Sequence, residues 1–354
     1  MSLVNLEGLD IILRLGFQSN SPERNIYLVN FSRLSNSAKG LAALCAMLAV
    51  LFFSVNDASI KFLSGDYALH QIVLVRSLIG LFVLLTIFVP FHGTFSVLKT
   101  RRLGMHFLRG LAVVFANLTF FLGLAELPLA EATAIFFVSP LLITVFSIFF
   151  LKERVGIHRW GSVAFGLIGV LIILRPGSEA FKFASLLPIA AAVGYATLHM
   201  LTRHIGKTES ALTMSFYIQI TFIFICCVFW FFVSDGRFIT EASPALNFLL
   251  REWGDLSNED WFLFALLGTS SAFGGFLISQ AYRKAEAAFV APFEYIAMPL
   301  SILWGMLVFK TTPDLQSFIG MGMIVASGLY IIWRETIRSQ KTSKKSSGTP
   351  KYRR

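Results

Sequence analysis

Charged residues are scarce in this chain, which is unusual for a protein that folds in water. Only 14% of its 354 residues are Asp, Glu, Lys or Arg, whereas 56% are hydrophobic and the mean hydropathy is +0.71. Soluble domains carry about 25% charged residues. The apolar excess extends from residue 40 to residue 334 in long unbroken runs, which indicates helices rather than the alternating pattern of membrane strands. The sequence therefore predicts an all-α, polytopic membrane protein.

Cysteine is also rare, with three copies in the chain, and the sequence lacks the motifs of several enzyme classes. Cys45, Cys226 and Cys227 lie inside apolar runs, so no extracellular disulfide framework is expected. The chain has no His/Cys cluster at zinc spacing, and no HExxH, GxSxG or paired-aspartate motif. It also lacks the phosphate-binding pattern GxxxxGK[ST], so ATP is not expected to drive it. No cofactor or metal is expected, and the protein is not expected to be an enzyme.

Ten apolar runs are long enough to cross a hydrocarbon core about 30 Å thick, which takes about 20 helical residues. They cover residues 40–62, 70–90, 104–124, 130–151, 157–175, 183–202, 212–233, 261–282, 288–309 and 315–334. Residues 1–39 form a polar N-terminal tail without the pattern of a signal peptide, and residues 335–354 form a basic tail. The sequence thus predicts ten transmembrane helices between two polar tails.

The positively charged residues predict how the chain is oriented in the membrane. Ten spans place both termini on one side, and most of the 30 Lys and Arg residues fall in the tails and loops of that side. The opposite side holds Lys61, Arg175, Lys182, Arg237, Arg251 and Lys310. Both termini are therefore expected to be cytoplasmic. We expect the basic tail to contact anionic membrane lipid, with no role in binding nucleic acid.

The chain resembles itself at an offset of 159 residues, which indicates an internal repeat. The matching pairs are Pro140 and Pro299, Phe150 and Phe309, Gly161 and Gly320, and Gly169 and Gly328. Five spans separate the copies, an odd number, so the second copy crosses the membrane in the opposite direction. We therefore expect two inverted five-helix repeats, residues 40–175 and 183–334, although a duplication kept for packing alone would leave the same pattern.

Prolines and glycines within the spans add expectations about helix geometry. Proline kinks a membrane helix by removing a backbone hydrogen bond, so Pro140, Pro292 and Pro299 are candidate hinges. The glycines of the fifth and tenth spans permit close helix contact, either within the chain or in a homodimer.

Two stretches resemble a known family. They run from Leu127 through LKER to Arg175-Pro176-Gly177, and over AYRKAEAAFVAPFEY at residues 281–295. With the ten spans, these stretches resemble drug/metabolite transporters with paired EamA domains over about residues 40–335. The resemblance implies a central cavity lined mainly by the third, fourth, eighth and ninth spans. In the second half, FKTTPD (residues 309–314) lacks the acidic residue usual at this turn, so the LKER turn is interpreted as a cytoplasmic anchor.

The same resemblance implies the activity. A secondary transporter of this kind carries a small metabolite across the bacterial inner membrane by alternating access, as inverted repeats allow. Amino acids, nucleosides and cofactor-like amphiphiles all suit such a cavity. Proton coupling stays open, and an intramembrane enzyme or a channel-like pore without a recognisable motif is the alternative.

Two charged residues lie at similar depth in the first two spans. A charge at the centre of a membrane helix costs about 2.5–3.5 kcal/mol on insertion scales, so each needs a reason. Asp57 and Arg76 are expected to form an ion pair that joins the two helices. The functional alternative makes Arg76 an anchor for an anionic group of the substrate, or Asp57 a proton-binding site.

Glu294 is the sharpest candidate for a functional residue. It lies in the ninth span between Pro292 and Pro299, and its counterpart in the first repeat is Ile135. The carboxylate is therefore not a symmetric packing feature. Prolines on both sides leave backbone carbonyls free to line a cavity. We expect Glu294 to contact a cationic group or carry a proton, with snorkelling to the membrane surface as the alternative.

Uncharged residues on the spans of the expected cavity complete the candidates. Asn117, Gln280, Tyr282 and Tyr295 are candidate substrate-binding residues, although each could equally form a hydrogen bond between helices. Phe136, Phe137 and Phe293 could form an aromatic wall. His199, which has no partner nearby in the sequence, is expected to be a hydrogen-bonded residue of the interior.

Overall fold

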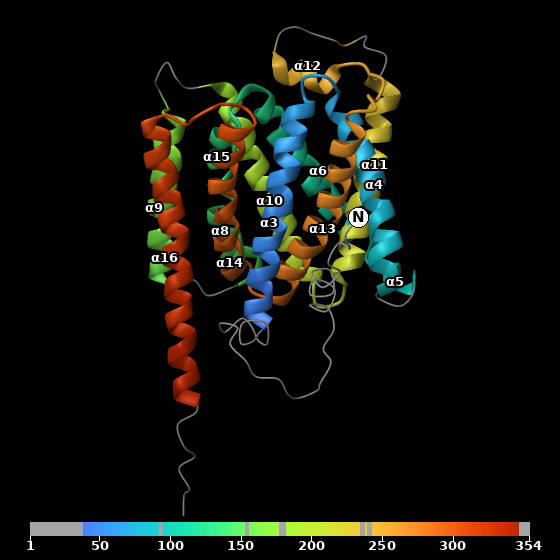
Figure 1. The fold of residues 1–354 in the computed structure, drawn as a ribbon. Coiled ribbons are helices and arrows are strands. Elements are labelled where there is room, and N and C mark those ends of the chain that lie inside the picture. The colour runs from blue at the N-terminus through green and yellow to red at the C-terminus, as the bar shows by residue number, and fades with distance from the viewer. Residues whose placement is uncertain are drawn as a thin grey trace, which may run out of the picture.

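The computed structural model describes residues 38–91, 95–152, 156–176, 182–233, 238 and 243–346, and within these ranges every regular element is a helix (Figure 1). The N-terminal tail lies outside the described residues apart from its last two positions, as do residues 347–354 and residues 153–155 of the LKER turn. The side chains of residues 335–346 are not described either.

Helices cover all ten of the apolar runs. The long ones are α3 (Ala38–Leu63), α4 (Leu69–Val83), α6 (Leu103–Glu126), α7 (Leu129–Phe136), α8 (Ser139–Leu151), α9 (Ile157–Leu174), α10 (Leu186–Ile205), α11 (Ala211–Val233), α13 (Trp261–Lys284), α15 (Ala297–Leu307) and α16 (Leu315–Ser346). The shorter ones are η1 (Leu84–Phe88), α5 (Val89–Phe91), η2 (Phe95–Leu98), η3 (Phe183–Ser185), α12 (Pro244–Leu250), α14 (Ala287–Val290) and η4 (Ala291–Ile296).

Seven of the helical segments within the described residues are long and apolar enough to cross a membrane. They are Ala38–Leu63, Leu69–Phe91, Leu103–Glu126, Leu129–Leu151, Phe183–Ile205, Ala211–Val233 and Trp261–Lys284. Three more apolar helices are shorter: Trp160–Leu174, Ala291–Leu307 and Leu315–Tyr330. The polypeptide is therefore a multi-pass membrane protein.

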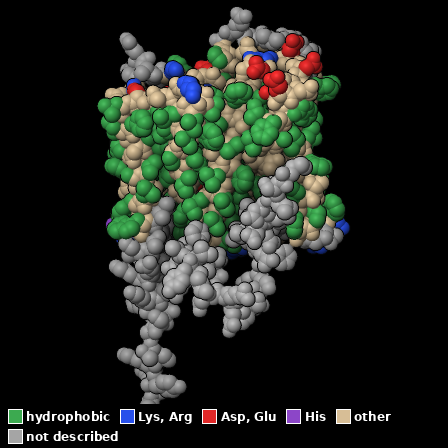
Figure 2. All heavy atoms as spheres, in the orientation of Figure 1, with side chains coloured by type: hydrophobic (Ala, Val, Ile, Leu, Met, Phe, Trp, Pro, Cys, Tyr) green, Lys and Arg blue, Asp and Glu red, His purple; other side chains and the backbone are tan. Residues whose placement is uncertain are grey.

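The surface of the helical bundle is apolar around its flank. Large side chains such as Phe149, Phe231 and Phe262 are more than 70% exposed, and hydrophobic side chains cover most of the face seen in Figure 2. A water-soluble protein rarely exposes so much contiguous apolar surface. Acidic side chains gather at one end, where the segment after α12 carries Glu252, Asp255 and Glu259. This arrangement suits a bundle surrounded by lipid.

The bundle is assembled from three closely packed helix pairs: α3 with α13, α9 with α16, and α6 with α10. The α9–α16 pair, at one side of Figure 1, is antiparallel, because Gly166 lies against Ser327 whereas Ile173 lies against Gly320. A Cβ built on Gly169 would lie 2.6 Å from the carbonyl oxygen of Gly320. Glycines of the fifth and tenth predicted spans thus allow the close contact expected of them.

The fourth and ninth predicted spans are both interrupted near a proline. The fourth consists of α7 and α8, which are separated by Phe137 and Val138, and Pro140 follows in the first turn of α8. The ninth passes from α14 through the 3₁₀ segment η4, which contains Pro292, into α15, where Pro299 is the third residue. Both interruptions lie beside the interior of the bundle, and the hinge role of the prolines stays a prediction.

Candidate functional site

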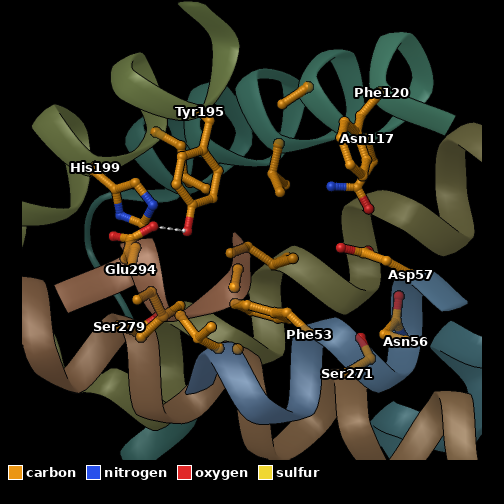
Figure 3. A pocket seen from close by; sticks show the side chains of 18 of the residues that line it. Phe53, Asn56, Asp57, Asn117, Phe120, Tyr195, His199, Ser271, Ser279 and Glu294 are labelled. Atoms are coloured by element: carbon orange, nitrogen blue, oxygen red, sulfur yellow. Dashed lines mark hydrogen bonds between the residues drawn. The ribbon is translucent and has the colours of Figure 1, made fainter. Parts of the chain in front are cut away.

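A cavity lies inside the bundle between helices of both halves of the chain. Its walls come from α3, α4, α6 and α7 of the first half and from α10, α11, α13, η4 and α15 of the second. About 150 Å³ is open to the centres of water molecules. Figure 3 shows Glu294 and His199 at one end and Asn56, Asp57 and Asn117 at the other. The cavity is therefore elongated, with polar groups at two separate ends.

Aromatic rings form the walls between these ends. Phe120 and Phe136 have ring centroids 5.0 Å apart, and Phe136 meets Tyr195 edge to face at 5.2 Å. Phe53 projects from α3 on the opposite side in Figure 3, and Phe137 also lines the space. Offset and edge-on arrangements at these distances are those that aromatic pairs prefer. The middle of the cavity can therefore bind a flat ring between apolar faces.

Arg76 organises one end of the cavity. Its side chain is 3% exposed, and its terminal nitrogens donate to the side-chain oxygens of Asn56 at 3.1 Å and Asn117 at 3.2 Å. The guanidinium also lies over the rings of Phe121 and Phe222, at 5.9 and 5.0 Å from their centroids. Helices α3, α4 and α6 are thus joined by one buried cation that hydrogen-bonds to neutral amides.

The expected ion pair between Asp57 and Arg76 is wrong for this structure. In the part of the chain that the structure describes, Asp57 has no hydrogen bond and no ion-pair partner. Successive residues of a helix point about 100° apart, so Asn56 faces Arg76 whereas Asp57 lines the cavity one position further round. Asp57 is half-buried and its carboxylate is available to a molecule in the cavity.

Glu294 lies at the other end, in η4. Its side chain is 4% exposed, and its Oε2 accepts a hydrogen bond from the hydroxyl of Tyr195 at 2.8 Å. The hydroxyl of Tyr282 donates to Oε1. The 3₁₀ turn places Glu294 toward the cavity, so that α10 and α13 each supply one tyrosine to hold it. Within the described residues, no cationic side chain lies within ion-pair distance of this carboxylate.

His199 lies beside the same tyrosines. Its ring stacks on Tyr282 with centroids 3.7 Å apart and meets Tyr195 edge to face at 4.1 Å. The side chain is 1% exposed and lines the cavity. Neither ring nitrogen has a hydrogen-bond partner among the described residues, so the expectation of a hydrogen-bonded interior histidine is wrong. Unpaired buried polar groups are rare and need an explanation.

Arg109 is the second buried cation of the cavity. Its side chain is 1% exposed, Nε donates to Thr202 Oγ1 at 3.0 Å, and one terminal nitrogen donates to the carbonyl oxygen of Met214 at 3.3 Å. Among the described residues no carboxylate pairs with it, and its other terminal nitrogen has no partner. Two carboxylates and two guanidinium groups therefore line one cavity without pairing with one another.

Comparison with known proteins identifies the family. The sequence profile of the EamA-like transporter family matches residues 40–175. A riboflavin transporter from Vibrio cholerae is 30% identical over 306 residues, covering 84% of this chain and 95% of that protein. The chain belongs to the EamA-like transporter family. It is a transporter of small metabolites and not an enzyme.

One more relative and one solved structure are similar to this chain. An S-adenosylmethionine uptake transporter from Rickettsia prowazekii is 28% identical over 289 residues, covering 82% of this transporter and 91% of that protein. A crystal structure of another protein, 19% identical, superposes with a TM-score of 0.60 over 82% of this chain and 95% of that one. This last likeness shows a shared fold.

The structure brings four of the predicted site residues together at the cavity: Asp57, Arg76, Asn117 and Glu294. Of the predicted aromatic wall, Phe136 and Phe137 line the cavity as well. Their role in binding a substrate stays a prediction.

The other candidates do not line the cavity. Tyr282 lies behind Glu294 as its hydrogen-bond donor, and Gln280 accepts a hydrogen bond from Arg283 at 3.1 Å. The ring of Tyr295 packs on Phe137 at 5.3 Å. Phe293 packs on Phe289, also at 5.3 Å. Their helices border the cavity, but these side chains point elsewhere.

Tyr195, His199 and Arg109 line the cavity but were not among the predicted site residues. A signal for each of them was present in the sequence. Tyr195, His199 and Thr202 are spaced i, i+4, i+7, so they share one face of an otherwise apolar helix. Polar residues on one face of a membrane helix favour the interior of a bundle over lipid. Arg109 lies within a predicted span, and a charged side chain inside the membrane is unfavourable enough to indicate a function.

Proposed function

We propose that this transporter is a secondary carrier that moves a flat, heteroaromatic metabolite of cofactor type by alternating access. The observation that carries the proposal is the central cavity, in which aromatic walls separate two polar ends and both halves of the chain contribute. Ligand pockets are mostly apolar with a few placed polar groups, as here. The names of the relatives, a riboflavin transporter and an S-adenosylmethionine uptake transporter, support cargo of this shape.

Alternating access follows from a fold of ten spans in two inverted five-helix repeats, which we propose for this chain. Three features support the repeat. The interrupted fourth and ninth spans have a proline at equivalent places. Helices α8 and α15 are each followed closely by a lysine in the left-handed backbone conformation, Lys152 and Lys310, both with φ of 55°. The antiparallel packing of α9 on α16 suits two halves related by a two-fold axis in the membrane plane.

We place the carrier in the bacterial inner membrane with both termini in the cytoplasm. Helix α3 begins and α16 ends on the same side of the bundle (Figure 1), and the C-terminal sequence is rich in Lys and Arg. Positive charge is retained on the cytoplasmic side. The acidic segment around Glu252, Asp255 and Glu259 lies at the opposite end, as an outer loop can.

Transport by the purified full-length chain in proteoliposomes tests the proposal. We expect uptake of riboflavin or S-adenosylmethionine that saturates and that is accelerated by unlabelled cargo inside the vesicles. Such acceleration is a property of a carrier whose cavity returns loaded, and a channel lacks it. Uptake no faster than in protein-free vesicles for both compounds would contradict the cargo class.

A matched pair of variants ties transport to the cavity. A Cβ at Gly275, which lines the cavity, would have the hydroxyl of Ser215 as its nearest neighbour at 3.9 Å, so Gly275→Phe directs a ring into the space. A Cβ at Gly322, exposed on α16, would meet nothing within 4 Å. We expect Gly275→Phe to abolish uptake and Gly322→Phe to leave it unchanged. Equal activity of the two variants would remove the cavity from the transport path.

A further inference from the structure

At the Glu294 end of the cavity, one face of α10 contacts both a carboxylate and a guanidinium group. Tyr195, His199 and Thr202 follow one another along α10 at i, i+4 and i+7. Tyr195 holds Glu294 of the second half through a hydrogen bond of 2.8 Å, and Thr202 accepts one of 3.0 Å from Arg109 of the first half. Glu294 and Arg109 therefore both line the cavity. His199 lies on α10 between the two residues that bind them.

The two charged groups are held apart and keep hydrogen-bonding capacity. A carboxylate has about four acceptor positions and a guanidinium has five N–H donors. Tyr195 and Tyr282 use two of the positions on Glu294, while Thr202 and the carbonyl oxygen of Met214 use two of the donors on Arg109. Within the described residues, Glu294 and Arg109 form no ion pair with each other or with a third group. Each charge is thus left for a ligand to neutralise.

His199 is the observation that points to a ligand. Its side chain is 1% exposed, it lines the cavity, and neither ring nitrogen has a partner among the described residues. Figure 3 shows its ring beside Glu294 at this end of the cavity. A neutral imidazole offers one donor and one acceptor, so it can hydrogen-bond to a carboxylate oxygen or to an ammonium proton. The unmet hydrogen bonds of His199 would be satisfied by a bound polar group.

We propose that this end of the cavity is a subsite for an α-amino-acid group, in which Glu294 binds the ammonium, Arg109 binds the carboxylate and His199 hydrogen-bonds between them. The inference rests on the proposed carrier function and assigns one end of the cargo. An α-amino-acid group carries both charges within a few bonds, so it neutralises both buried side chains at once. A buried charge left unpaired is strongly unfavourable, which gives the subsite its selectivity.

The opposite end suits the ring of such a cargo. There both terminal nitrogens of Arg76 donate to the side-chain oxygens of Asn56 and Asn117, whereas one terminal nitrogen of Arg109 has no partner among the described residues. Amide groups at the end of aromatic walls can hydrogen-bond to the edge of a heteroaromatic ring. The cargo would then lie along the cavity with its amino-acid group at Glu294.

Two probes that differ in the amino-acid group test the subsite. S-adenosylhomocysteine and 5′-methylthioadenosine share the adenosine and the thioether, and only the first has the α-amino-acid group. Binding to the purified full-length transporter in detergent is measured by equilibrium dialysis, with riboflavin as a third probe. We expect S-adenosylhomocysteine to bind at least tenfold more tightly than 5′-methylthioadenosine. Glu294→Gln and Arg109→Lys should each reduce this ratio toward one, without weakening 5′-methylthioadenosine.

Control variants separate the subsite from general damage. Asp57→Asn, at the opposite end, should keep the ratio. If Glu294→Gln does not fold, His199→Phe replaces it, since a phenyl ring keeps the stacking on Tyr282 but has no nitrogen. Its ratio should also fall toward one.

Each other outcome overturns the inference. Equal binding of the two adenosyl compounds would leave the carrier standing without an amino-acid subsite. A tenfold ratio that survives both Glu294→Gln and His199→Phe would place the amino-acid group elsewhere. Binding of riboflavin but of neither adenosyl compound would contradict the amino-acid subsite, because riboflavin has no amino-acid group. Failure of all three probes to bind the folded protein would instead contradict the proposed cargo class, and the subsite with it.

Discussion

Replacing Gly320 by alanine should weaken the packing of α16 on α9, whereas the same change at Gly322, two residues further on, should not. A Cβ at Gly320 would lie 2.6 Å from the carbonyl oxygen of Gly169 and 2.6 Å from Cγ1 of Ile173. At Gly322 the added Cβ would meet nothing within 4 Å. Both positions belong to the same helix, so the two variants differ in the contact and in little else.

The size of the effect follows from these distances. Heavy atoms at an optimal separation lie about 3.5–4.0 Å apart, so the backbones of α9 and α16 must move apart to admit the methyl group at Gly320. Overpacking of this kind destabilises by about 1–3 kcal/mol. Alanine also has a better helix propensity than glycine by about 0.5–1 kcal/mol, but this gain is common to both variants and cancels. Gly320→Ala should therefore be less stable than Gly322→Ala by about 1–3 kcal/mol.

Thermal unfolding in detergent, followed by tryptophan fluorescence, measures the difference. For a chain of this size each kcal/mol shifts the midpoint by roughly 2 °C, so we expect Gly320→Ala to unfold several degrees below Gly322→Ala. The partner helix offers a second matched pair, since a Cβ at Gly169 lies 2.6 Å from the carbonyl oxygen of Gly320 and one at Gly161 meets nothing within 4 Å. Identical midpoints within both pairs would refute the close contact of α9 and α16.

Three further predictions concern charged side chains. Lys61 donates to two carbonyl oxygens at the end of α6, at 2.7 and 2.8 Å. Hydrogen bonds from a charged donor contribute about 1.5–3 kcal/mol to stability. Lys61→Met should therefore lower the thermal midpoint, and Lys61→Arg should lower it less. Arg76→Gln should reduce the yield of folded protein, and adding Asp57→Asn should not restore it, because Asp57 and Arg76 form no ion pair. Recovery of the yield in the double variant would show that they do. At the surface, a hydrogen bond from Arg175 lowers the pKa of Asp314 from 3.8 to about 2, so the stability it contributes is complete above about pH 4 and is lost as the pH falls through 2. This exposed pair contributes at most about 1 kcal/mol, and the midpoint of the wild type should fall further than that of Asp314→Asn over this range.

The sequence was a good guide to the helices because a single strong signal, apolar run length, dictates them. Helices form at all ten predicted ranges. The fifth and ninth predicted spans form shorter apolar helices for local reasons. In the ninth, Pro292 and the 3₁₀ turn of η4 interrupt the helix, and in the fifth the apolar part begins only at Trp160.

The cavity was harder to predict because it depends on which way each side chain points. Asn56 and Asp57 are neighbours in the sequence, and both lie at the depth of Arg76, yet the rotation between them decides which one contacts it. Tyr282 was a candidate either for binding a substrate or for a hydrogen bond between helices, and the structure shows it donating to Glu294. The partnership of Glu294 with Tyr195 joins residues 99 positions apart. No local sequence pattern predicts such a contact, because it forms only when α10 and η4 pack together.

We propose that the cavity opens alternately to the two sides of the membrane, and one cysteine tests this directly. In a chain whose native Cys45, Cys226 and Cys227 are replaced by alanine, Gly275→Cys places a thiol in the cavity. We expect a membrane-impermeant maleimide to modify this thiol in both right-side-out and inside-out vesicles, and cargo to slow the reaction. Gly322→Cys, exposed on α16, should stay unmodified in lipid. Modification of Gly275→Cys from one side only, with or without cargo, would contradict alternating access.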